Sequence, residues 1–203
     1  MGRSVGKYIA FFLALTCLLF AAACGKKEEA GGLSYDGIKI EDCVRLGEYR
    51  GLSITLDGED ADRGSAVWQA VLERAEILDY PESAVSYYTE QSEARCRYYA
   101  KENRVSYEEA MTALGLSEEK ISEDARRLVA NDLIFRAVVL DAGITLTEDD
   151  KTRYFDKYVD KYVENWGYER DYVKNELADL VYDSMLYDKT TEYLIRNNSF
   201  LYE

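Results

Sequence analysis

The chain has 203 residues, of which 47% are hydrophobic and 13% aromatic, with a net charge of -14 and no histidine. This apolar content is enough for a packed core and excludes a disordered chain. The negative charge disfavours binding to nucleic acid or anionic headgroups through a basic patch. The lack of histidine excludes Ser-His and Cys-His catalysis and histidine zinc sites. A single proline and long runs at helical spacing predict a mostly α fold.

Residues 1–23 are typical of an export signal. Arg3 and Lys7 give a basic start, and an apolar run then ends in small residues immediately before Cys24. The stretch LLFAAAC resembles the lipobox of bacterial lipoproteins, which implies that Cys24 carries lipid, palmitate included. Lipid chains there would hold the protein on the extracytoplasmic side of the cell membrane. An uncleaved membrane anchor is the alternative interpretation.

The next segments precede the helical part of the chain. Residues 24–34 are polar and glycine-flanked, which predicts a flexible tether after the lipidated cysteine. Residues 35–60 contain short apolar alternations between Ile38 and Leu56, which predict one or two short strands or a hairpin. The acidic loop Asp57–Asp62 superficially suggests calcium, but it lacks the ligand spacing of an EF-hand and is expected to be solvated.

Residues 61–203 are predicted to be a helical domain, because apolar residues recur there at helical spacing between capping signals. Its centre is Leu128–Leu140, which is too apolar for a helix with one wet face and too short to cross a bilayer. Four other helices are predicted by their spacing: Ala66–Leu78 with a cap near Ser65, Pro81–Asn103, Thr147–Trp166 and Glu169–Arg196. A capping box of Ser106 and Glu109 begins a short helix that ends at Gly115, and Ser117 caps a segment that leads into the centre.

Aromatic side chains on two of these helices are the candidate binding residues. Four tyrosines fall on one side of Pro81–Asn103. On Thr147–Trp166, Tyr158 and Trp166 belong to the apolar face, and Tyr154 lies beside it. Each set could pack against neighbouring helices or present an adaptable face to a partner. The candidates for polypeptide binding are Tyr87, Tyr88, Tyr98, Tyr99, Tyr154, Tyr158 and Trp166.

Residues Trp68–Phe200 resemble the C-terminal, SurA-like domain of trigger factor, a bacterial folding chaperone. The resemblance lies in the order of ILDYPESAV, LSEEKISEDARRLVANDLIFRAVVLDAGITLTEDD and YVENWGYERDYVKNEL. The stretch LGEYRGLSITL also looks like the strand-forming linker of that family. In that family a helical body with two arm-like projections encloses a cradle, which holds unfolded polypeptide without nucleotide. The resemblance implies that the Pro81 helix begins one arm and that the chain from Thr147 contributes to another.

Two features of the family are missing. The chain has no Gly-Phe-Arg-x-Gly-Lys signature for ribosome docking, and there is no room between Leu56 and Trp68 for a prolyl-isomerase domain. We therefore expect no ribosome binding and no isomerase activity. The expected protein is a membrane-tethered, chaperone-like lipoprotein that binds unfolded or nascent exported polypeptides without ATP. The alternative is an assembly lipoprotein that grips one specific folded partner.

Neither catalysis nor a cofactor is expected, since nothing in the sequence specifies a paired acid and base or a metal site. Cys43 and Cys96 are the cysteines that remain after Cys24 and the signal peptide are set aside. Outside the cytoplasm they could form a disulfide that ties the β segment to the first arm. Two free thiols are the equal alternative.

Overall fold

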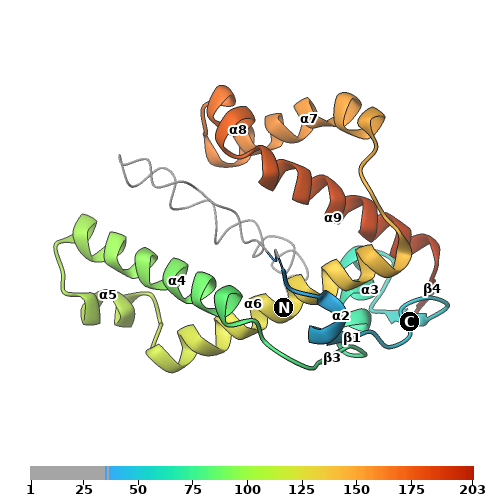
Figure 1. Cartoon of the computed structure of the whole chain (residues 1–203), viewed down its shortest axis with the longest axis horizontal. Helices are drawn as coiled ribbons and strands as arrows, with labels where there is room; N and C mark the ends of the chain where they lie inside the picture. Colours follow the sequence, from blue (N-terminus) through green and yellow to red (C-terminus); the bar gives the residue numbers. More distant parts are fainter. Residues whose placement is uncertain (1–34, 36) are drawn as a thin grey trace. The chain divides into compact units, whose positions relative to one another are not determined.

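The computed structural model describes residues 35 and 37–203, and Figure 1 traces their course. In this part of the chain eight helices account for most residues, and the strands are short. The prediction of a mostly helical chain with a short β segment towards its N-terminal side is therefore confirmed. The predicted signal peptide, the lipid site at Cys24 and the tether lie outside the described residues.

The described chain divides into two compact units. The first unit combines Leu46–Glu76 with Phe135–Glu203, and the second combines residues 35 and 37–45 with Ile77–Ile134. The two units thus alternate along the sequence, each built from two separate stretches. The first unit contains β2 (Ser53–Leu56), α3 (Arg63–Leu72), α7 (Glu148–Trp166), α8 (Arg170–Glu176), α9 (Ala178–Arg196) and β4 (Ser199–Tyr202). The second contains α2 (Ile40–Cys43), β1 (Val44–Arg45), α4 (Glu82–Asn103) and α5 (Tyr107–Ala113), while β3 (Glu76–Ile77) and α6 (Glu118–Ala142) contribute residues to both.

Helix α6 contains the apolar stretch predicted as a buried helix, Leu128–Leu140. Leu133 is completely buried and most of its apolar neighbours are buried, which confirms the prediction for most of the stretch. The segment predicted to be capped by Ser117 belongs to the same helix, which begins at Glu118, and Gly143 follows its end with a φ of +62°. The prediction is wrong at Leu140, whose residue surface is 63% exposed. Leu133 and Leu140 lie on the same side of the helix, so helical spacing alone could not distinguish the buried from the exposed leucine.

Two short strands form within Ile38–Leu56, as predicted, but they do not pair with each other as a hairpin. The first part of this segment makes a single helical turn, α2, and the two-residue strand β1, which pairs with β3. Strand β2 instead pairs in parallel with β4, with Ser53 opposite Ser199 and Leu56 opposite Tyr202. Parallel strands cannot be joined by a tight turn, so the partner of β2 is distant in sequence. Local alternation of apolar residues indicates a strand but does not identify the partner of that strand. Two predicted strands close together in sequence therefore suggested a hairpin, although the pattern did not specify that they pair.

Helix α3 is shorter at its C-terminal end than the predicted helix Ala66–Leu78. The helix spans Arg63–Leu72, and its N-cap is Asp62 rather than a residue near Ser65. The Asp62 carboxylate accepts a hydrogen bond from the Ser65 N–H at 3.0 Å. The chain then leaves the helix and forms β3, so the apolar residues at 77 and 78 only imitate a continuation of the helical pattern.

Capping signals locate the starts of three helices correctly. Ser106 and Glu109 form the predicted reciprocal box at the start of α5, and Thr147 and Asp150 form an equivalent box at the start of α7. The Ser117 hydroxyl accepts a backbone N–H at 3.2 Å in the first turn of α6. These contacts involve residues three positions apart, which explains why they can be predicted from local sequence.

The predicted last helix, Glu169–Arg196, is divided in two. Helix α8 ends at Glu176, and α9 begins after Leu177, whose φ of -115° and ψ of 16° are not helical. Helix α8 is held on α7 by ion pairs: Asp156 lies 2.7 Å from the Lys174 ammonium and 3.3 Å from the Arg170 guanidinium. The break occurs without proline or glycine, because it depends on this packing rather than on local propensity.

An aromatic cluster forms the core contact between α3 and α9 in the first unit. The Trp68 ring stacks on Tyr187 with centroids 5.3 Å apart and meets Phe135 edge to face at 6.1 Å. The Trp68 indole N–H donates a hydrogen bond to the Thr191 hydroxyl at 2.7 Å. The cluster therefore joins apolar packing to a satisfied polar contact, which fixes how α3 lies on α9.

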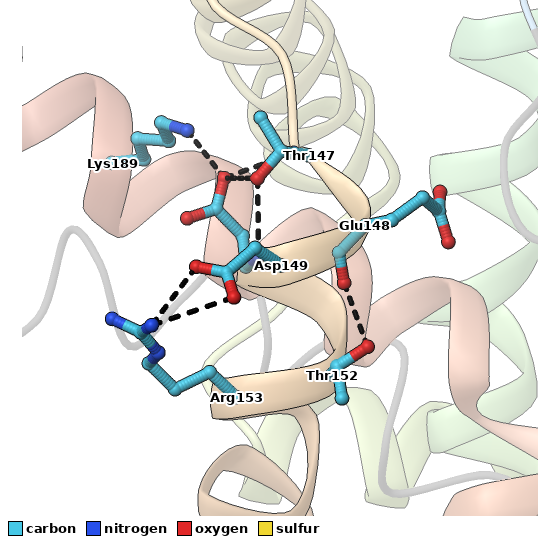
Figure 2. Close-up of polar contacts among 7 residues, drawn as sticks. Thr147, Glu148, Asp149, Thr152, Arg153 and Lys189 are labelled. Atoms are coloured by element: carbon cyan, nitrogen blue, oxygen red, sulfur yellow. Dashed lines mark hydrogen bonds and ion pairs between the residues drawn. The ribbon is translucent and has the colours of Figure 1, made fainter.

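The first turn of α7 is tied to α9 through Lys189 (Figure 2). Asp150 accepts hydrogen bonds from the Lys189 ammonium and from both the N–H and the hydroxyl of Thr147, each of the latter at 2.9 Å. In the same turn Asp149 pairs with the guanidinium of Arg153 at 3.2 Å. The hydrogen bond from Lys189, followed by those from Thr147, lowers the pKa of Asp150 from 3.8 to about 2.

This lowered pKa predicts a pH dependence of stability. Because the folded state favours the charged form of Asp150, its contribution is complete above pH 3.8 and is lost as the pH falls towards 2. The unfolding temperatures of the wild-type protein and of Asp150→Asn are therefore expected to differ at neutral pH and to converge in acid. Thermal unfolding followed by circular dichroism tests this, with Asp149→Asn as the control. A difference between wild type and Asp150→Asn that does not change with pH would contradict the assignment.

Candidate functional site

The four candidate tyrosines of α4 differ in how far they are exposed. The helix spans Glu82–Asn103, close to the prediction. Tyr88 is only 4% exposed and packs its ring edge to face against Tyr87, with centroids 5.3 Å apart. Tyr98 is 39% exposed, whereas Tyr87 and Tyr99 are half-buried. Tyr88 is thus part of the core of the second unit, and Tyr98 is the candidate on this helix best placed to meet a ligand.

The three candidates on α7, in the first unit, differ in the same way. Tyr154 is 41% exposed. Tyr158 is half-buried, because its hydroxyl donates a hydrogen bond to Asp188 of α9 and the Lys161 ammonium lies 4.1 Å from its ring centroid. Burial, reinforced by that hydrogen bond, raises the pKa of Tyr158. Trp166 is also half-buried and packs on Tyr162. Tyr158 therefore contributes to the contact between α7 and α9, and Tyr154 is the exposed candidate.

The seven candidates are divided between the two units, with four in the second and three in the first. Other large apolar side chains that sequence reasoning missed are also exposed. They are Leu78 and Val105 in the second unit and Leu140, Leu201 and Tyr202 in the first. Leu201 and Tyr202 lie in β4, beyond the last predicted helix, and Leu140 continues an apolar pattern that is otherwise buried. The sequence therefore contained no signal that these three side chains are exposed.

A groove lies between β2 and α3 in the first unit. Its volume is about 260 Å³, and its walls are Ser53, Ile54 and Thr55 on the strand side and Ala66, Gln69 and Ala70 on the helix side. Glu73 and Arg74 line the remainder of the groove. The two alanines leave space beside the strand, so the groove combines a small apolar wall with backbone groups of a strand edge.

The two described cysteines are free thiols, and both are buried. The disulfide considered for Cys43 and Cys96 is not formed in the structure. The structure instead has the alternative, two separate thiols. Burial is the main cause that raises the pKa of each thiol, and the neighbouring carboxylate of Asp79 adds to the effect at Cys43. A raised pKa reduces the thiolate fraction at neutral pH, so both side chains behave as small core residues.

The described residues contain neither a metal-binding cluster nor a helix that could span a membrane. Among residues 35 and 37–203, no group of three or more acidic or cysteine side chains is arranged to hold a metal ion. In the same part of the chain, every helix is too short or too polar to span a bilayer. Comparisons with models of protein families, with curated proteins and with solved structures found no match.

Proposed function

We propose that the protein is a membrane-tethered, extracytoplasmic lipoprotein that binds unfolded or exported polypeptides without ATP, in the manner of a chaperone. The observation that carries the proposal is the exposure of large apolar side chains on both units of an acidic chain. Tyr98 and Tyr154 are the two candidate residues that this exposure favours. The resemblance to the trigger factor domain supports the same function, and Cys24 is the proposed lipid site.

The physical basis of the proposal is hydrophobic burial in many weak contacts. Each apolar patch that an unfolded client covers contributes about 25 cal/mol per Å² of buried surface. Patches of one or two side chains give weak, reversible contacts, which would allow release without nucleotide hydrolysis. The excess of acidic residues would keep the complex soluble. No catalytic step, cofactor or metal enters this mechanism, and neither ribosome nor nucleic acid is a proposed partner.

The test is suppression of aggregation by the full chain held in lipid nanodiscs. Several unrelated denatured proteins are diluted into buffer without ATP, and light scattering is recorded. The wild-type protein is expected to suppress aggregation of all of them. A variant with Tyr98→Ala and Tyr154→Ala should keep its helical circular dichroism and bind clients about tenfold more weakly, because two exposed aromatic contacts are lost.

The matched control carries Glu90→Ala and Lys157→Ala, two exposed positions on the same helices, and leaves the net charge unchanged. It should protect clients as well as the wild type. If no client is protected at a several-fold molar excess, the chaperone proposal is wrong. Capture of one folded partner at a fixed stoichiometry would then support the assembly function instead.

A further inference from the structure

Strand β2 has one paired edge and one open edge. Its two-stranded sheet contains only β2 and β4. The Ser199 N–H donates to the Leu52 carbonyl at 2.8 Å, and the Glu203 N–H donates to the Leu56 carbonyl at 3.2 Å. Successive residues of a strand direct their backbone groups to opposite edges, so the residues in register with Leu52 and Leu56 serve β4. Ser53 and Thr55 therefore direct their N–H and C=O groups to the other edge.

The open edge faces the groove beside α3. Ser53 and Thr55 have exposed side chains, and their backbone groups have no hydrogen-bond partner in residues 35 and 37–203. Ile54, Ala66 and Ala70 form the apolar part of the groove wall. An unpaired strand edge beside a small apolar pocket is the arrangement that binds an extended peptide by strand addition.

The loop after β2 adds a preference for charge. Asp57, Glu59 and Asp60 are all exposed, and no cation among the described residues pairs with them. These carboxylates directly follow the open edge in sequence. A segment lying on that edge is therefore favoured electrostatically when it carries lysine or arginine.

We infer that the open edge of β2 binds an extended segment of an unfolded polypeptide, which pairs with the backbone of Ser53 and Thr55. The segment places an apolar side chain in the groove at Ala66 and Ala70 and is enriched in basic residues near Asp57. This inference rests on the proposed function, and it identifies one place where a client is held and the sequence features that such a client carries. Backbone pairing explains how unrelated clients can share one site, because every segment offers the same N–H and C=O groups.

The probe is a short fluorescein-labelled peptide in which valine alternates with lysine or threonine, added to the full chain in nanodiscs. Fluorescence anisotropy is expected to show saturable binding, and the Thr55 amide should become protected from hydrogen exchange. Thr55→Pro removes the N–H from the open edge without touching the bonds to β4, and proline is tolerated on such an edge. It should weaken binding about fivefold, the effect of one lost hydrogen bond, whereas Thr55→Ala should not.

One further variant and one modified peptide distinguish pairing at the strand edge from nonspecific hydrophobic binding. Ala66→Phe fills the groove from the helix side and should also weaken binding, and a peptide with N-methylated backbone amides should bind poorly. Equal binding of both peptides, or no effect of Thr55→Pro and Ala66→Phe, would overturn the inference. The proposed function would still stand in that case if unrelated clients remain protected. Self-association through β2, detected as a dimer that Thr55→Pro dissociates and that excludes the peptide, would also overturn it.

Discussion

Replacing Trp68 with alanine is expected to lower the free energy of unfolding of the first unit by about 3–5 kcal/mol. Trp68 is only 4% exposed, and its ring contacts both Tyr187 and Phe135. Alanine would leave a cavity between α3 and α9, which neighbouring side chains fill only in part. The loss of the indole hydrogen bond to Thr191 adds a smaller amount. Trp68 thus joins α3 to α9 both through an aromatic stack and through a part-buried hydrogen bond.

Urea unfolding of the purified protein measures this effect. In Trp68→Ala the remaining tryptophan is Trp166, which also belongs to the first unit, so its fluorescence reports on that unit alone. Trp68→Phe is the matched control, because it keeps an aromatic ring in the cluster and loses only the hydrogen bond and part of the volume. It should be clearly more stable than the alanine variant. Equal stability of the two variants would mean that the aromatic stack is not what holds α3 on α9.

Leu133→Ala is expected to destabilise the second unit by about 2–5 kcal/mol, whereas Leu140→Ala on the same helix should change stability by no more than about 0.5 kcal/mol. The two substitutions have the same effect on helix propensity. They differ in burial, since Leu133 is 0% exposed and Leu140 is 63% exposed. The comparison therefore isolates the contribution of packing.

Alkylation of Cys96 provides the measurement for Leu133→Ala. The Cys96 side chain is completely buried within the second unit, so a thiol reagent reaches it only when that unit opens. Leu133→Ala should accelerate its modification strongly, as followed by mass spectrometry of the peptide that contains Cys96. Leu140→Ala should leave the rate close to that of the wild type. A similar rate in all three proteins would contradict the central position of Leu133.

The sequence predicted the helices better than their ends or their partners. Capping at Ser106 and Thr147 depends on residues within one turn, and these starts are correct. The pairing of β2 with β4 depends on residues that are far apart in the sequence, and the local alternation could not reveal it. The break at Leu177 likewise depends on how α8 is held on α7, which no local residue preference encodes.

The candidate site shows the same limit. Helical spacing identified Tyr87, Tyr88 and Tyr98 as neighbours along one side of α4, but spacing alone could not tell that Tyr88 is buried and Tyr98 exposed. That difference depends on which neighbouring element covers each turn. The groove beside β2 was missed for a related reason, because it exists only where α3 lies next to a strand whose partner is remote in sequence.

The division of the first unit has a consequence for the order in which the chain acquires its structure. Its two stretches, Leu46–Glu76 and Phe135–Glu203, are separated by nearly all of the second unit. Contacts between such distant stretches require closing a long loop, which slows folding relative to contacts between neighbours. During synthesis or export from the N-terminus, Ile77–Ile134 emerges before Phe135–Glu203. The second unit, whose other stretch ends at Arg45, can thus complete its packing while Leu46–Glu76 still lacks its partner, so the two units mature in sequence.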